Sequence, residues 1–176
     1  MKEDKSMEFK ELAEKRYSCR KFSNQKVEQH LLDQIIDTAI KAPTAVNTQP
    51  YKIFCMDSTE AKENIHKVTP FTFGADTFLV IGYKEDSGWV RSFDNRNFSD
   101  VDCSIVATHI MMEICDLGLA TTWVGHFDAP LLKQMYPAMK DYNLIAIFPI
   151  GYAAEDDQPS PKHYKRKTKK EVFEML

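Results

Sequence analysis

Two arginines and a hydroxyl lie within five residues near the N-terminus, at Arg16, Ser18 and Arg20. In an extended segment, side chains at alternate positions point to the same face, so these three would share one surface. The guanidinium fork matches phosphate oxygens bidentately, and a serine hydroxyl adds another donor. The spacing therefore predicts a phosphate site, and the alternative is a solvated turn after a helix.

A second polar segment, Ala42–Tyr51, is a proline-bounded loop of small and amide side chains. Asn47 and Gln49 each offer an amide donor and an amide acceptor, which can bind the carbonyl and imine edge of a heterocycle without adding charge. Ordinary turn chemistry is the alternative, because Asn and Pro are common in loops. Together with the arginine segment, the loop predicts a site for a phosphorylated cofactor that contains a flat ring.

The stretch Thr121–Phe127 places Gly125 at the end of a predicted strand, where a backbone can approach a planar ligand closely. His126 could donate a proton, although a single histidine beside a strand is more often structural. Trp123 and Phe127 are expected in the core rather than against a ligand.

The stretch Lys162–Lys170 is the densest positive cluster of the chain. Three interpretations are open: a solubilising tail, a nucleic-acid patch, or cations that close over the same phosphate as Arg16 and Arg20. The formal net charge of −3 weakens the nucleic-acid interpretation.

A length of 176 residues fits one domain, and a hydrophobic share of 43% is normal for a globular protein. The longest apolar runs, such as Phe78–Tyr83, have the length of a strand and not of a membrane span. The charged start Met1–Lys5 is not followed by a hydrophobic stretch, so no signal peptide is expected. We expect a cytoplasmic protein without membrane or nucleic-acid partners.

The four cysteines are scattered, and no pair has metal-ligand or C-x-x-C spacing. This pattern predicts no metal site and favours a reducing compartment. Cys19 lies inside the arginine segment and could be a redox thiol, but burial as a small hydrophobic side chain is the expectation for all four.

Hydrophobic periodicity predicts helices that alternate with strands and therefore an α+β domain. Helices are predicted over about Glu28–Lys41, Thr59–Lys67 and Asp100–Leu117, with short ones before Arg16 and after Asp128. Strands are predicted over Tyr51–Met56, Phe78–Tyr83, Thr121–Val124 and Asn143–Ile150, and the polar segment Lys84–Ser99 is predicted to be a loop.

Two apolar segments are expected to be buried against other parts of the protein or against a partner chain. The helix Asp100–Leu117 is apolar nearly all round, which indicates full burial or contact with a partner chain. The C-terminus ends in the apolar run Val172–Leu176 after a polar tail. The chain contains no G-x-G-x-x-G, P-loop, G-x-S-x-G or H-E-x-x-H motif, which argues against Rossmann dehydrogenases, P-loop enzymes, α/β-hydrolases and zincins.

These motifs, in this order, resemble the nitroreductase family of flavin mononucleotide (FMN) enzymes. The resemblance covers nearly the whole chain. Its matching segments are Arg16–Phe22, the helix leading into Ala42–Tyr51, Ala75–Gly82, the stretch from Asp102 through Gly118 to Gly125, Gly151-Tyr152 and Arg166-Lys167.

The resemblance implies one domain over residues 1–176, with a central mixed or antiparallel sheet flanked by helices in an interlocked homodimer. It implies two FMN sites at the subunit interface, with the tail of about residues 151–176 packing on the partner. It also implies ping-pong electron transfer from NADH or NADPH to an organic acceptor such as a nitroaromatic or a quinone. The alternative is a flavin-binding or regulatory protein with little or no turnover.

The site residues follow from the same resemblance. The phosphate and ribityl contacts would be Arg16, Tyr17 through its backbone, Ser18 and Arg20, with Arg166 and Lys165 closing on the phosphate. The other subunit would supply Pro43, Thr44, Ala45 and Asn47, with Gln49 beside them. The segment Thr122, Trp123, Val124 and Gly125 would pass the flavin ring. No side chain is nominated as catalytic, because the flavin carries out the chemistry.

Two departures from the family pattern concern the ring. The loop before Phe78 shows no clear counterpart of the lysine or amide that many members hold against the pyrimidine edge, and Lys67 is the nearest cation. His126 stands where many members have a smaller residue, so an acceptor of different shape is expected.

Overall fold

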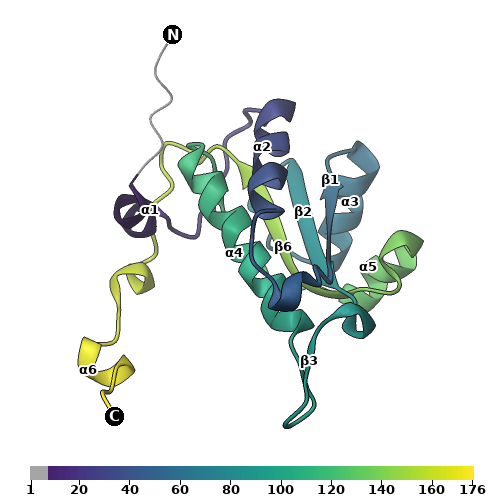
Figure 1. The fold of residues 1–176 in the computed structure, drawn as a ribbon. Coiled ribbons are helices and arrows are strands. Elements are labelled where there is room, and N and C mark those ends of the chain that lie inside the picture. The colour runs from purple at the N-terminus through teal and green to yellow at the C-terminus, as the bar shows by residue number, and fades with distance from the viewer. Residues whose placement is uncertain (1–7) are drawn as a thin grey trace.

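The structure is a computed structural model that describes residues 8–176, so the charged start Met1–Lys5 lies outside the described residues. A four-stranded antiparallel sheet of order β1-β2-β6-β5 forms its centre (Figure 1). The strands are β1 (Tyr51–Met56), β2 (Thr77–Tyr83), β5 (Ala120–Thr121) and β6 (Asn143–Gly151). The helices are α1 (Phe9–Lys15), α2 (Gln29–Ala39), α3 (Thr59–Val68), α4 (Ser99–Asp116), α5 (Ala129–Met135) and α6 (Lys169–Val172).

Helices cover both faces of the sheet, with α2 and α4 on one face and α3 and α5 on the other (Figure 1). Strand β2 shows the reason, because successive side chains of a strand point to opposite faces. Leu79 and Ile81 pack with α2 and α4, whereas Phe78 and Val80 pack with α3 and α5. The apolar run that the sequence shows here is thus a strand buried on both faces. The predicted α+β class and the antiparallel form of the sheet are confirmed.

Local signals in the sequence set three helix ends as predicted. The Ser58 hydroxyl accepts a hydrogen bond from the Ala61 N–H at 3.1 Å, which caps α3. The Asp128 carboxylate accepts from the Leu131 N–H at 2.9 Å and caps α5. Gly118 follows α4 with φ of +73°, the left-handed conformation that glycine adopts without steric cost.

Two predicted elements were wrong in detail. The segment Lys84–Ser99 contains a hairpin of β3 (Val90–Arg91) and β4 (Arg96–Asn97), and not only loop. Ion pairs and contacts of guanidinium groups with the Phe98 ring hold this hairpin. Because charged side chains make these contacts, the sequence lacks the alternation of apolar and polar residues by which strands are recognised. The predicted strand Thr121–Val124 is shorter, because only Ala120–Thr121 forms β5 and Val124 makes a single bridge to Ile147.

The C-terminal tail returns to the N-terminal segment by backbone pairing. Phe22 forms an antiparallel bridge with Ala153, the Ser23 N–H donates to the Tyr152 carbonyl at 2.8 Å, and the Ala154 N–H donates to the Lys21 carbonyl at 2.9 Å. Beyond this pairing the tail runs along the side of the molecule where α1 lies (Figure 1). None of the helices within residues 8–176 has the length and apolar composition needed to span a bilayer.

Replacing Ile110 by alanine tests the packing of α4 against the sheet. Ile110 is 0% exposed, so we expect the free energy of unfolding to fall by about 2–5 kcal/mol, the usual cost of a buried aliphatic truncation. Ile40→Ala is the control, because Ile40 is 56% exposed and its truncation should change stability by about 0.5 kcal/mol or less. Urea unfolding at one protein concentration measures both. Equal losses in the two variants would contradict this description of the core.

Candidate functional site

Cations from both ends of the chain meet in one hollow of about 240 Å³. Arg16, Ser18 and Arg20 contribute from the segment after α1, and the tail contributes around the short 3-10 helix η4 (Pro161–Tyr164). The tail residues that line the hollow are Ser160, Lys162, His163 and Arg166. The structure therefore brings together the arginine segment and the basic tail, which lie about 140 residues apart in the sequence.

Backbone pairing explains why Ser18 and Arg20 face this hollow. The Cys19 N–H donates to the Thr121 carbonyl at 3.0 Å, and the Cys19 side chain is fully buried. Because alternate side chains of an extended segment point to opposite sides, burial of Cys19 directs its two neighbours outward. Within residues 8–176, no carboxylate forms an ion pair with Arg16, Arg20 or Arg166. Their charges remain available to an anion.

A second hollow, of about 340 Å³, adjoins the first, and Arg20 lines both. It is lined by Thr122, Trp123, Val124, Gly125 and His126 on one side and by Phe71 and Phe73 on the other. The two phenylalanine rings stack at 5.9 Å, and the Thr69 hydroxyl donates to the His126 carbonyl at 2.8 Å, which ties the two sides together. An aromatic lining beside a cationic one suits a flat ring attached to a phosphate.

Trp123 differs from its predicted place in the core. Its side chain is 37% exposed and lines the second hollow, while its ring meets the Phe148 ring edge-on at 5.3 Å. The indole thus contacts the core through Phe148 and also borders the hollow. Sequence reasoning placed it wholly inside because tryptophan is usually buried.

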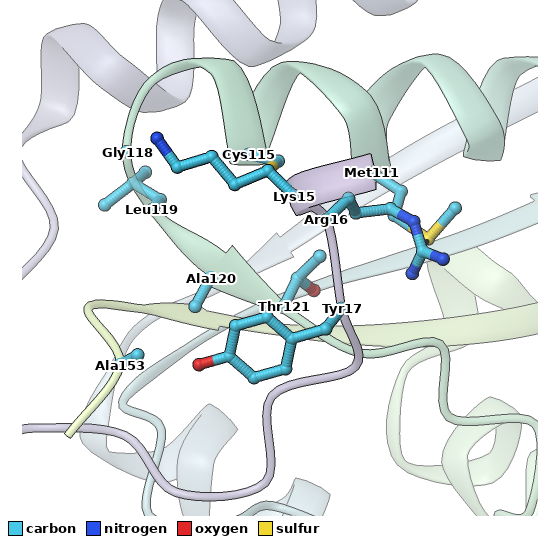
Figure 2. Close-up of a pocket in the computed structure, with 10 residues that line it drawn as sticks. All are labelled: Lys15, Arg16, Tyr17, Met111, Cys115, Gly118, Leu119, Ala120, Thr121 and Ala153. Carbon is cyan, nitrogen blue, oxygen red and sulfur yellow. Dashed lines mark hydrogen bonds between the residues drawn. The ribbon is translucent and has the colours of Figure 1, made fainter. Parts of the chain in front are cut away.

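The Tyr17 side chain faces a third hollow, of about 180 Å³, between the end of α1, α4 and β5. Figure 2 shows the Tyr17 ring near Ala153, with the Arg16 guanidinium directed toward Met111 and the Lys15 amino group pointing away from it. The Arg16 guanidinium lies 3.9 Å from the Met111 sulfur. Any contact of Tyr17 with the basic hollow must therefore come from its backbone.

The Cys19 thiol lies next to the Asp157 carboxylate. Burial, and secondarily this carboxylate, raise the pKa of Cys19 to about 12. The same two causes raise the pKa of Tyr17. Both side chains are therefore neutral at physiological pH. This favours the structural interpretation of Cys19 over the redox one, because the thiolate is the reactive form.

The amide loop lies at a different place on α4. The Asp102 carboxylate, in the first turn of α4, accepts a hydrogen bond from the Ala45 N–H at 2.9 Å. Met111, which touches Arg16, is nine residues further along the same helix, or about 13 Å at 1.5 Å per residue. None of the residues Pro43, Thr44, Ala45, Asn47 and Gln49 lines any of these three hollows. Within one chain, the structure does not join the loop to the basic hollow.

Sequence reasoning missed several lining residues. It located the cluster Lys162–Lys170 but selected Lys165, which does not line the basic hollow, and it passed over Ser160. It gave no signal for Phe71 and Phe73, whose place depends on a turn. Lys67, the expected cation for a ring edge, donates to the Asn64 amide oxygen at 2.8 Å. No group of His, Cys, Asp or Glu in the described part of the chain could hold a metal ion.

Comparison with known proteins identifies relatives over most of the chain. A model of the Nitroreductase family matches residues 13–69 and 66–152. A Methanothermobacter thermautotrophicus protein, provisionally named an NADH dehydrogenase/NAD(P)H nitroreductase, is 27% identical over 85% of this chain and 80% of its own length. Human iodotyrosine deiodinase 1 is 36% identical over 86% of this chain, but the chain spans only 63% of that protein.

Solved structures show the same fold. A nitroreductase family protein of Clostridium difficile is 31% identical, with a TM-score of 0.87 over 96% of this chain and 98% of the other. A nitroreductase-type protein of Exiguobacterium sibiricum, solved in complex with FMN, has a TM-score of 0.82 over 97% and 98% of the two chains. Its identity of 18% makes it a guide to the fold alone.

Thiol labelling tests the surroundings of Cys19. A pKa of about 12 leaves about one thiolate in ten thousand at pH 8, and the side chain is fully buried. We therefore expect a maleimide to modify the exposed Cys55 first and to leave Cys19 and Cys103 unmodified in the folded protein. Peptide mass spectrometry after timed labelling measures this order. Modification of Cys19 as fast as Cys55 would show an open, reactive thiol instead.

Proposed function

This chain belongs to the nitroreductase family, and on that premise we propose that it is an FMN-dependent oxidoreductase that passes electrons from NADH or NADPH to an organic acceptor. The observation that supports this proposal most is the convergence of Arg16, Ser18, Arg20 and Arg166 on one hollow that adjoins an aromatic one. NAD(P)H appears in the name of a relative, and FMN in the description of a solved structure of this fold.

The donor set fits the phosphate of FMN. Arg16 and Arg20 of the segment surround this space together with Lys162 and Arg166 of the tail. Within residues 8–176, none of these four side chains forms an ion pair with a carboxylate. Guanidinium groups bind phosphate oxygens bidentately, and the hydroxyls of Ser18 and Ser160 add donors. The aromatic hollow across Arg20 would then take the ring, with Thr122–Gly125 along its side.

The role of the protein's own residues is to bind and orient FMN. Bound FMN supplies hydride transfer between the nicotinamide cofactor and the acceptor. Arg16, Arg20 and Arg166 fix the phosphate end, and a glycine at position 125 lets the backbone approach the ring without a side chain between them. The Asn47 and Gln49 amides offer neutral hydrogen bonds to the ring edge. Such preoriented dipoles are most effective where charge develops on the ring.

We further propose a homodimer in which each site combines two chains. Val101, Ile105 and Met112 are apolar and only partly buried, and they follow one another along α4 at helical spacing. A two-fold contact through the middle of α4 would set the Asp102 end of one helix beside the Met111 end of the other. The amide loop of each subunit would then reach the basic hollow of its partner. The exposed apolar run Val172–Leu176 would form an arm over the partner surface.

The acceptor is proposed only as a class. A hollow lined by Phe71, Phe73 and Trp123 favours a flat aromatic or quinoid compound, such as a nitroaromatic or a quinone. One observation favours the alternative of a flavin-binding protein without turnover. The Lys67 amino group donates to Asn64, so Lys67 does not place its charge at the ring edge. Anaerobic mixing of the FMN-loaded protein with NADH and with NADPH separates the two, because only the enzyme loses its yellow colour rapidly.

Arg166→Ala tests the phosphate site. We expect purified wild-type protein to bind FMN and to show its visible spectrum. The variant should bind FMN about 10- to 100-fold more weakly, because it loses a charge-assisted hydrogen bond. Lys170→Ala removes the same charge from the same tail outside the hollow and should bind FMN like wild type. Fluorescence titration of FMN measures all three affinities. A colourless wild-type protein that takes up no FMN would end the proposal.

Mixed dimers test the sharing of sites. One chain would carry Arg16→Ala with Arg20→Ala, and the other Asn47→Ala with Gln49→Ala. If each site combines the arginines of one chain with the loop of the other, the mixed dimer has one intact site and one doubly defective site. Titration should then show half the sites with wild-type affinity for FMN, although each homodimer shows none. If both sites of the mixed dimer are weakened equally, each site takes its loop and its arginines from the same chain.

A further inference from the structure

The amide loop has an unusual backbone. Val46, Asn47 and Gln49 have φ of +45°, +58° and +49°, the left-handed region that residues with a Cβ rarely adopt. This conformation costs on the order of 1–2 kcal/mol for a residue such as Val46 or Gln49, whereas asparagine adopts it more readily. For Val46 it is especially unfavourable, because its side chain is β-branched. The Val46 side chain is 75% exposed, so its own packing does not offset the cost.

A buried carboxylate holds this loop. Asp102 is 2% exposed, and its Oδ1 atom accepts from the Ala45 N–H at 2.9 Å. Its Oδ2 atom lies 3.5 Å from the Thr48 hydroxyl, which also donates to the Ala45 carbonyl at 3.1 Å. The carboxylate therefore contacts the loop on both sides of its left-handed residues 46 and 47. Since α4 packs against the sheet, the anchor is rigid.

Hydrogen bonds within the loop then order the two amides as a pair. The Gln49 N–H donates to the Thr44 hydroxyl at 3.1 Å, and the Gln49 Nε2 atom donates to the Asn47 Oδ1 atom at 3.1 Å. In the described part of the chain, no hydrogen bond occupies Asn47 Nδ2 or Gln49 Oε1. The loop thus presents the donor NH2 group of Asn47 and the acceptor oxygen of Gln49 side by side. An edge with a carbonyl next to an N–H, as in the pyrimidine part of FMN, is complementary to this pair.

We propose that Asp102 is a positioning residue for the cofactor: it holds the loop Thr44–Gln49 in the strained conformation that presents the Asn47 and Gln49 amides to the ring edge. This inference rests on the proposed function. Asp102 itself does not reach a ligand, because it is buried and both of its carboxylate oxygens face the loop. It acts through the backbone of Ala45 and the hydroxyl of Thr48.

The first test needs no cofactor. Asp102→Ala removes both contacts, and Asp102→Asn keeps an oxygen that can accept from the Ala45 N–H. Thr48→Val removes the weaker contact with Asp102 and the bond from the Thr48 hydroxyl to the Ala45 carbonyl, but keeps the bond from the Ala45 N–H to Asp102. Asp100→Asn is the matched control, since Asp100 lies two residues away on α4 and pairs with the exposed Arg96 at 2.8 Å. Hydrogen exchange of the peptide covering residues 44–49 should quicken at least tenfold in Asp102→Ala, less in Asp102→Asn and Thr48→Val, and not at all in the control. Unchanged exchange in Asp102→Ala would overturn the anchoring.

The second test uses the FMN-loaded protein. Asp102→Ala should weaken FMN binding by about 10- to 100-fold, the range for a lost charge-assisted hydrogen bond and its consequences. It should also shift the midpoint potential of the bound flavin to a more negative value, because misplaced donors stabilise the reduced ring less. Asp102→Asn should recover part of both effects, and Asp100→Asn should match wild type.

The outcomes separate the two proposals. A potential equal to that of wild type in Asp102→Ala, with only stability lowered, would make Asp102 a purely structural residue and overturn its positioning role. If Asp102→Ala does not fold, the same criteria apply to Asp102→Asn and Thr48→Val, which each keep one contact. If wild type binds no FMN, the proposed function fails and with it the role toward the ring.

Discussion

The site depends on the backbone pairing of one short extended segment. Residues 19–23 hydrogen-bond to Thr121 on one side and to Tyr152 and Ala154 of the tail on the other. These bonds are neutral and directional, and they hold cations from two distant parts of the chain around one hollow although like charges repel. Burial of Cys19 at the centre of the segment fixes which side chains face outward. An anion in the hollow would relieve the repulsion that the pairing opposes.

Helix α4 connects this hollow to the amide loop. One of its side chains, Met111, touches Arg16, and another, Asp102, holds the loop through Ala45. Because protein interiors are packed as densely as organic crystals, a helix packed on a sheet keeps the groups it carries at fixed relative positions. The two halves of the proposed cofactor site are therefore set by one rigid element, and symmetry between two chains would bring the halves together.

The aromatic hollow forms the apolar side of the candidate site. Phe71, Phe73, Trp123 and His126 line it, and the Thr69 hydroxyl joins the end of α3 to the segment after β5 by donating to the His126 carbonyl. The engagement of Lys67 with buried Asn64 removes the one cation that the sequence offered for the ring edge. In the proposed site, the neutral amides of Asn47 and Gln49, on the loop that Asp102 holds, would take its place.

The sequence alone determined the features that depend on local chemistry. Ser58, Asp128 and Gly118 set helix ends because capping needs only neighbouring backbone groups. The apolar run Phe78–Tyr83 indicated a buried strand, which the structure shows as Thr77–Tyr83. The alternation of Arg16, Ser18 and Arg20 likewise indicated a common face. Features that depend on contacts between distant residues were decided only by the tertiary structure. Ser160 and Lys162 reach the arginines through the pairing of the tail with residues 21–23, Asp102 holds a loop 54 to 57 residues away, and Phe71 enters the site through a turn. No periodicity or spacing along the chain encodes such meetings, because they follow from which faces of the sheet the helices cover.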